Sequence, residues 1–126
     1  MLKTGFKALL AQANAVIESV SVQDLPYLQD EPDVVVVDVR DATERETDGT
    51  IPGSLHASRG LLEFHADPEC PAHLPALVPD KRIVLFCGTG GRSALAAKTL
   101  QDMGFSDVVS LAGGFAAWKA ANKKKD

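Results

Sequence analysis

The run Val34-Val35-Val36-Val37 constrains the fold more than any other part of the chain. Consecutive β-branched residues without alternation favour a strand that is covered on both faces, as in a parallel sheet. The segment Ile83 to Phe86 has the same character, Val108 to Leu111 is a third candidate, and a weaker one surrounds Leu55 to Ala57. Because helical patterns alternate with these strands, we predict an α/β domain with a central, mostly parallel β-sheet.

Three segments carry a helical pattern or a cap signal, and the short stretch from Gly60 to Phe64 also looks helical. Apolar residues at helical spacing over 1–16 predict an amphipathic helix with one face to bury: Leu2, Phe6, Leu9, Leu10, Ala13 and Val16, with Ile17 next in the pattern. A short helix is expected across 22–29, with Ser21 as its N-cap and Asp24 as the acidic member of a capping box. A third runs from Ser93 to Met103, with one apolar side formed by Ala96, Leu100 and Met103, and with Gly104 at the left-handed C-cap.

The composition narrows the class of protein. The chain has 126 residues, 45% of them hydrophobic and 24% charged, which suits one compact domain with a core of its own. The net charge is −4, and the only basic run, Lys123 to Lys125, is interpreted as a solvated tail, so no nucleic-acid partner is expected. No run approaches the roughly 18 apolar residues of a membrane helix. Two cysteines in a chain with an adequate core indicate a reducing compartment, and we expect a cytoplasmic protein.

The stretch from Asp67 to Asp80 contains four prolines and is predicted to be a surface loop. It holds Cys70, whose role the sequence leaves open between a bystander and a resolving thiol. His65, Cys70 and His73 have spacings that suit a metal, but a zinc site requires a fourth ligand and an ordered frame. We therefore expect no metal and no cofactor.

The segment that carries chemistry runs from Cys87 to Ser93: Cys87, Gly88, Thr89, Gly90, Gly91, Arg92 and Ser93. It joins the end of a buried strand to the start of a helix, where open parallel sheets build their ligand sites. Its three glycines allow backbone N–H groups to turn inward, and such a nest at a helix N-terminus attracts an anion. We expect Arg92 to add a positive charge beside it.

The anion that this loop itself supplies is the thiolate of Cys87. Helix N-termini and neighbouring cations lower thiol pKa values from about 8.5 to roughly 3.5–7.5. The nest would thus hold Cys87 as a nucleophile without a separate general base. The plainer interpretation is a small hydrophobic residue at the end of a core strand. A dinucleotide site is rejected, because Ser93 stands where the third glycine of GxGxxG belongs.

Four motifs follow one another along the chain: Asp38-Val39-Arg40 followed by Glu44, then Gly49 to Ser54, then Cys87 to Arg92, and finally Gly113-Gly114-Phe115 with Trp118. Through these motifs the sequence resembles the rhodanese family from about Ile17 to Ala121, with Thr50 in place of the usual histidine. It implies one three-layer domain over 1–126, in which helix 1–16 precedes a rhodanese-like body at 17–121 and a basic tail at 122–126.

The resemblance also implies sulfur transfer through a persulfide on Cys87, from a donor such as thiosulfate to a thiol or cyanide acceptor. Phosphatases that share this fold have a C-x₅-R loop, whereas Cys87 to Arg92 is C-x₄-R, which suits the smaller sulfur atom. Gly88 stands where many members carry Arg, so one anion-steering charge is missing, and the donor stays open between thiosulfate and a protein or low-molecular-weight persulfide. The Thr50 substitution is expected to affect only turn packing.

The resemblance places Arg59 near the pocket mouth, as a contact for the substrate anion. The alternative is that Arg59 is an ordinary surface arginine. Asp38 and Arg40 are interpreted as a brace beneath the loop, and His56 as a turn-packing residue. Two alternatives to an enzyme stay open. The first is a persulfide carrier or sulfide sensor that serves a protein partner, and the second is an inactive interaction domain. The chain is expected to be a monomer or a homodimer.

Overall fold

The structure is a computed structural model, and it describes residues 1–123. Within these residues, five parallel strands form one sheet in the order β1-β5-β4-β2-β3. The strands are β1 (Glu18–Val20), β2 (Val34–Asp38), β3 (Leu55–His56), β4 (Arg82–Phe86) and β5 (Val108–Leu111). The predicted α/β architecture is confirmed, and the sheet is entirely parallel.

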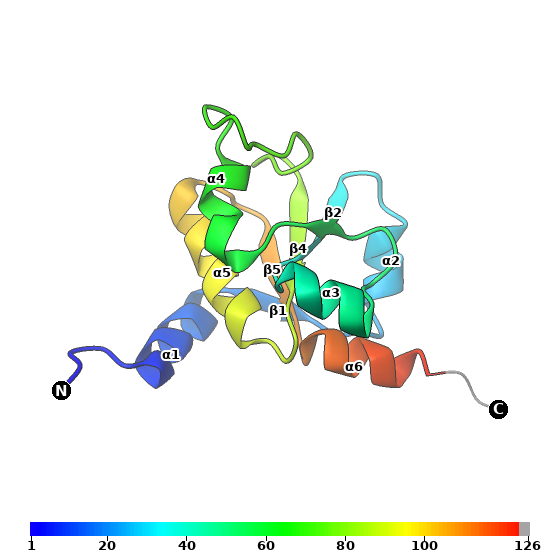
Figure 1. The fold of residues 1–126 in the computed structure, drawn as a ribbon, viewed down its shortest axis with the longest axis horizontal. Coiled ribbons are helices and arrows are strands. Elements are labelled where there is room, and N and C mark those ends of the chain that lie inside the picture. Colours follow the sequence, from blue (N-terminus) through cyan, green and yellow to red (C-terminus); the bar gives the residue numbers. More distant parts are fainter. Residues whose placement is uncertain (124–126) are drawn as a thin grey trace.

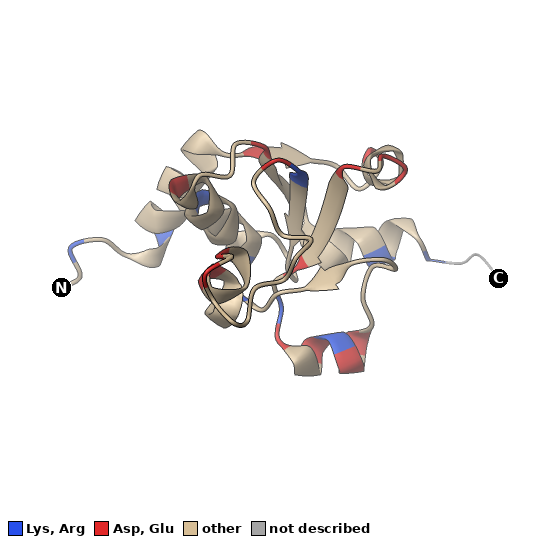
Figure 2. Ribbon diagram, turned by 90° about the horizontal axis from the view of Figure 1, so that it is seen from above, with Lys and Arg blue, Asp and Glu red and all other residues tan. Residues whose placement is uncertain are grey.

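The helices pack on both sides of this sheet (Figure 1). They are α1 (Phe6–Val16), α2 (Leu25–Gln29), α3 (Ala42–Asp48), α4 (Leu62–Ala66), α5 (Gly91–Met103) and α6 (Gly114–Ala121), with a short 3₁₀ helix η1 (Arg59–Leu61) before α4. Charged residues lie on helices, on loops and at strand ends, while the middles of the strands are free of them (Figure 2). None of the helices in residues 1–123 combines the length and apolar character that crossing a bilayer requires.

Alternate residues of the central strands face two separate apolar cores. On β4, Ile83 and Leu85 pack with α4 and α5, whereas Val84 and Phe86 pack with α2 and α6. Because side chains alternate across a strand, a strand covered on both faces must be apolar at every position. The valine run of β2 follows the same rule, with Val37 in one core and Val36 in the other.

Helix α5 ends where the sequence predicts, but its last apolar residue does not face the core as predicted. Gly104 has φ 113° and the left-handed conformation, and its N–H donates to the carbonyl of Gln101. The N–H of Phe105 reaches back to Leu100, and the Phe105 ring is buried in the core. The prediction that Met103 joins the apolar side is wrong: Met103 is exposed, because Phe105 fills the place beneath the helix end.

The N-terminal helix was expected to bury one apolar face, and this is only partly so. Helix α1 packs against α5, and Ala13 is its only fully buried residue. The larger side chains of Phe6, Leu9 and Val16 are exposed, because none of the other elements within residues 1–123 covers the outer side of α1. The strand β1 begins two residues after this helix.

The sequence patterns missed several elements. β1 is a short strand at the sheet edge, and α3 buries no residue, so neither carries a strong apolar signal. Helix α6 follows the glycine pair at 113–114 and was not predicted. The helix expected over 22–29 begins only at Leu25, after a turn in which Ser21 Oγ accepts the Asp24 N–H. The expected loop over 67–80 has no helix or strand, and positions 124–126 of the predicted basic tail lie outside the described residues.

Candidate active site

Cys87 directly follows β4, the middle strand of the sheet, and the loop 87–90 leads into α5. The side chain is almost entirely buried, with 1% of its surface exposed. Gly90 is the N-cap of α5 at φ 120°, a conformation that L side chains rarely adopt. The loop thus sets the sulfur at the carboxyl end of the sheet and at the start of a 13-residue helix, as the sequence predicts.

The loop surrounds the sulfur with two N–H donors and one hydroxyl. The N–H of Gly90 lies 3.1 Å from Cys87 Sγ and the N–H of Ser93 lies 3.4 Å from it, while Ser93 Oγ is at 3.6 Å. Burial raises the pKa of Cys87, but the hydrogen bonds that its thiolate accepts from the Ser93 hydroxyl and from the N–H groups of Ser93, Gly90 and Thr89 outweigh burial and hold the pKa below that of an ordinary thiol. The arrangement therefore favours a thiolate.

The start of α6 holds the loop in this shape. The N–H of Phe115 donates to the carbonyl of Cys87 at 2.7 Å, and that of Ala116 donates to the carbonyl of Gly88 at 3.0 Å. With these carbonyls directed toward α6, the later N–H groups of the loop are free to face the sulfur. A Cβ at Gly114 would lie 2.5 Å from the Cys87 carbonyl oxygen, so the close approach requires glycine there.

Arg92 does not present a free charge to the loop, contrary to our expectation. Its Nη1 and Nη2 donate to Glu44 Oε1 and Oε2 at 2.6 and 2.9 Å. The hydrogen bond from Arg92 lowers the pKa of Glu44 to about 2, and the same bond raises the pKa of Arg92. Glu44 also accepts the N–H of Asp41 and so completes the capping box that starts α3.

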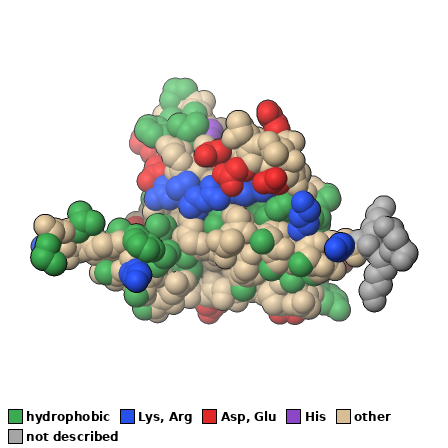
Figure 3. Space-filling view, turned by 60° about the horizontal axis from the view of Figure 1, so that its bottom comes forward, with side chains coloured by type: hydrophobic (Ala, Val, Ile, Leu, Met, Phe, Trp, Pro, Cys, Tyr) green, Lys and Arg blue, Asp and Glu red, His purple; other side chains and the backbone are tan. Residues whose placement is uncertain are grey.

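Two hollows flank the loop at Thr89. The charged hollow has about 310 Å³ and is lined by Arg40, Glu44, Asp48, Gly88, Thr89, Phe115, Ala116 and Lys119. The neutral hollow has about 380 Å³ and is lined by Leu10, Asn14, Ser19, Thr89, Gly90, Gly91, Ser110, Leu111, Ala112 and Gly113. With the lower side of the molecule turned forward, a band of Lys and Arg side chains lies beside acidic ones (Figure 3). The positive charge of this band is thus accompanied by negative charge.

A sequence model of the family described as Rhodanese-like domain matches residues 21–121. The chain belongs to the rhodanese-like domain family. The resemblance stated from the sequence is therefore confirmed, and helix α1 lies ahead of the matched region of this rhodanese-like protein.

Relatives of this rhodanese-like protein carry two kinds of name. Thiosulfate sulfurtransferase GlpE of Pseudoalteromonas translucida (strain TAC 125) is 36% identical over 107 residues, which cover 84% of this chain and 92% of that protein. Dual specificity phosphatase Cdc25 of Arabidopsis thaliana is 32% identical over 127 residues, covering 93% and 82%. The structure of a protein of unknown function from Rhodopseudomonas palustris CGA009, described as a possible tyrosine phosphatase, has a TM-score of 0.91 and 45% identity, covering 100% and 97%.

The predicted brace beneath the loop of the rhodanese-like domain is present and fully buried. Asp38 Oδ1 accepts Arg40 Nε at 3.0 Å, and Asp38 Oδ2 accepts Arg40 Nη2 at 2.9 Å. Burial raises the pKa of Asp38, but the hydrogen bonds from Arg40 hold it below the usual value. The guanidinium carbon of Arg40 lies 4.3 Å from the ring centroid of Phe115 and so links the brace to α6. Thr50 does more than pack the turn, because its hydroxyl donates to Asp38 Oδ2 at 3.0 Å.

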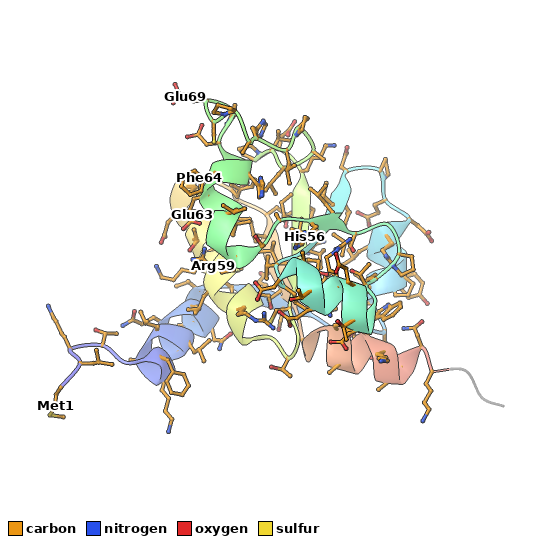
Figure 4. The ribbon with its side chains drawn as sticks, viewed as in Figure 1. Met1, His56, Arg59, Glu63, Phe64 and Glu69 are labelled. Atoms are coloured by element: carbon orange, nitrogen blue, oxygen red, sulfur yellow. The ribbon has the colours of Figure 1, made fainter. Side chains whose placement is uncertain are left out.

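Arg59 is not brought together with the loop. It lies on η1, where its Nη1 donates to Glu63 at 3.0 Å and its Nη2 donates to Thr99 of α5 at 3.0 Å (Figure 4). The hollow that it lines, with Leu9 and Leu95 among its neighbours, is neither of the two beside Thr89. We therefore leave Arg59 out of the site proposed below.

The histidine side chains of this domain lie at hydrogen-bond distance from backbone carbonyl oxygens. His56 Nε2 lies 2.7 Å from the carbonyl oxygen of Arg40, in keeping with a turn-packing role. His65 Nδ1 and His73 Nε2 lie at hydrogen-bond distance from carbonyl oxygens of the loop after α4. Cys70 lies in that loop, beside Glu69, which Figure 4 places far from the start of α5. This loop precedes β4, whereas Cys87 directly follows β4. The two thiols therefore lie toward opposite ends of that strand.

Proposed function

We propose that this protein is a sulfurtransferase that carries a sulfane sulfur as a persulfide on Cys87. The observation that carries the proposal is the position of Cys87 Sγ, buried and facing the N–H groups of Gly90 and Ser93 at 3.1 and 3.4 Å. These fixed dipoles stabilise an anionic sulfur in a site that excludes water. No cofactor and no metal are needed for this chemistry.

The reaction runs in two halves. The Cys87 thiolate attacks the outer sulfur of thiosulfate, a new S–S bond forms, and the bond to the sulfonate breaks, releasing sulfite and leaving the persulfide anion. An acceptor then attacks the outer persulfide sulfur and restores the thiolate. Cyanide leaves as thiocyanate, and a thiolate acceptor leaves as its own persulfide. Each half conserves charge, so no oxidant or proton donor is required.

We assign the approach of the donor to the charged hollow, which opens beside Gly88 and contains Lys119. Arg40, which also lines it, is already paired with Asp38. A small dianion thus meets a modest positive field, because Arg92 is held by Glu44. This pairing, together with Gly88 in place of a cation, favours a second candidate: a persulfide carrier that accepts sulfur from a protein partner and turns over thiosulfate slowly.

Because one relative is named as a phosphatase and another is described as a possible one, phosphate hydrolysis is a competing proposal for the activity. A phosphatase loop must direct several donors at three phosphate oxygens, and its arginine has to be free to bind them. Here the loop has four residues between Cys87 and Arg92, and both terminal nitrogens of Arg92 are bonded to Glu44. We therefore propose sulfur transfer in preference to phosphate hydrolysis. We also propose that the protein is cytoplasmic and that it is a monomer or a homodimer.

Steady-state turnover tests these alternatives. Thiocyanate formation from thiosulfate and cyanide is measured for the wild type, for Cys87→Ser and for Cys70→Ser as the matched control. We expect turnover in the wild type and in Cys70→Ser, and none in Cys87→Ser. Faster turnover from a protein persulfide than from thiosulfate would support the carrier. Hydrolysis of p-nitrophenyl phosphate that depends on Cys87, without thiocyanate formation, would overturn the proposal.

A further inference from the structure

A second buried hydroxyl lies behind the active-site loop. Ser110, on β5, is 5% exposed, and its Oγ is 2.8 Å from the Oγ of Ser93, which is fully buried. Ser93 Oγ in turn lies 3.6 Å from Cys87 Sγ and 3.1 Å from the carbonyl oxygen of Gly90. Ser110 and Cys87 are thus connected through one intervening hydroxyl.

The Ser93 hydroxyl has one proton, and this limits what it can do at once. When Cys87 is a thiol, the S–H can donate to Ser93 Oγ, and the Ser93 proton can go to Gly90 or Ser110. A thiolate can only accept, so the Ser93 proton has to turn toward the sulfur. The carbonyl of Gly90 competes for that proton.

A donor to Ser93 shifts this competition. If the Ser110 hydroxyl donates to Ser93 Oγ, the short 2.8 Å contact is satisfied without using the Ser93 proton. A hydroxyl that accepts one hydrogen bond also becomes a better donor in the next. Ser110 has room to turn, because it lines the neutral hollow together with Asn14 and Ser19.

We propose that Ser110 is a positioning residue that directs the Ser93 hydroxyl toward the Cys87 sulfur whenever that sulfur is a thiolate. Its value to catalysis rests on the function proposed above, since the thiolate is the attacking group there. Ser110 itself touches no reacting atom and acts through Ser93.

Ser110 carries no charge, so its substitution leaves the charged groups around the active-site loop in place. They are Arg92 of α5 with its partner Glu44 of α3, the buried pair of Asp38 and Arg40, and Lys119 of α6 beside Gly88. Asp41 at the start of α3 also acts on Arg92. A change in the titration of Cys87 on altering Ser110 therefore reports on the hydroxyl chain.

Threonine and valine at position 110 make a matched pair, because they have the same shape and differ by one hydroxyl. Both residues suit a β-strand, and the neutral hollow borders position 110. In a Cys70→Ser background, which leaves one thiol, the rate of Cys87 alkylation by iodoacetamide is measured against pH. We expect Ser110→Thr to stay close to the Ser110 protein, and Ser110→Val to raise the midpoint by about 0.5–1 pH unit, the size of one hydrogen bond.

Equal midpoints for the threonine and valine proteins would overturn the proposal, whether both match the Ser110 protein or both depart from it. If the valine protein does not fold, Ser110→Ala supplies the hydroxyl-free comparison, with the same expected shift. Alkylation needs no sulfur donor, so this result is independent of the proposed activity. A protein that shows the shift but gains sulfur neither from thiosulfate nor from a protein persulfide would retain the role of Ser110 and lose the sulfurtransferase assignment.

Discussion

Arg92 and Glu44 join the active-site loop to helix α3 through two hydrogen bonds, from Nη1 to Oε1 at 2.6 Å and from Nη2 to Oε2 at 2.9 Å. Glu44 also accepts the Asp41 N–H at 3.1 Å, so one carboxylate both starts α3 and holds the arginine. The pair decides how much positive charge the loop offers to an incoming anion.

Glu44→Gln should make Arg92 more available to a donor anion, because glutamine keeps the length of the side chain but removes its charge. We expect the KM for thiosulfate to fall about two- to fivefold, the effect of an exposed pair worth up to about 1 kcal/mol, with kcat little changed. Glu46→Gln, at an exposed position of the same helix, is the control and should leave KM unaltered. An unchanged or higher KM in Glu44→Gln would show that Arg92 does not steer the donor.

The titration of Cys87 should lie at lower pH in the folded protein than in the unfolded chain. Hydrogen bonds to the sulfur hold the pKa of Cys87 below that of an ordinary thiol. The thiolate fraction grows as the pH rises through the pKa, so the rise in alkylation rate should occur at a lower pH in the folded protein than in the unfolded chain. The same shift stabilises the fold above the pKa of the unfolded thiol, and this contribution disappears as the pH falls through the folded value. Alkylation rates of Cys70→Ser, folded and in guanidinium, measure the difference; coincident profiles would contradict it.

Gly114→Ala should destabilise the protein and disturb the loop. A Cβ there would lie 2.5 Å from the Cys87 carbonyl oxygen, at a residue with φ 61°. We expect a loss of about 2 kcal/mol or more in the free energy of unfolding, together with an altered alkylation rate at Cys87. Gly60→Ala is the control, because a Cβ added at Gly60 would meet no neighbouring atom within 4 Å, and it should change stability by less than about 1 kcal/mol. Urea unfolding distinguishes the two variants.

Asp38→Asn should be among the most destabilising polar substitutions, because it leaves the buried guanidinium of Arg40 without its counter-charge. Breaking one partner of a buried pair costs about 3–5 kcal/mol. Asp107→Asn removes a more exposed partner, from Arg82, and should cost less than about 1 kcal/mol. If thermal unfolding gave the two variants similar losses, the brace would contribute far less than its burial indicates.

The sequence predicted the sheet well because Val34 to Val37 and Ile83 to Phe86 are covered on both faces, and such strands need apolar residues throughout. It predicted the position of Cys87 for a related reason: loops that follow central parallel strands form sites. Helix α3 was missed because it buries nothing and depends on its capping box, although Asp41 and Glu44 at capping-box spacing were a readable signal.

The partners of the site could not be read in the same way. Arg92 and Glu44 are 48 positions apart, and no periodicity reveals that they meet. Ser110 looks like one polar residue in an apolar strand, and its meaning depends on facing Ser93 across the α5 side of the sheet. Arg59 shows the converse: a role taken from a resemblance does not fix where a long side chain points.

The central claim is that Cys87 takes up sulfur, and intact-mass measurement of the reduced protein after incubation with thiosulfate tests it most directly. We predict that the wild type and Cys70→Ser gain the mass of one sulfur atom, that dithiothreitol removes it, and that Cys87→Ser gains nothing. A gain of one sulfur in Cys87→Ser, or no gain from thiosulfate or a protein persulfide in wild type whose Cys87 still alkylates, would contradict it.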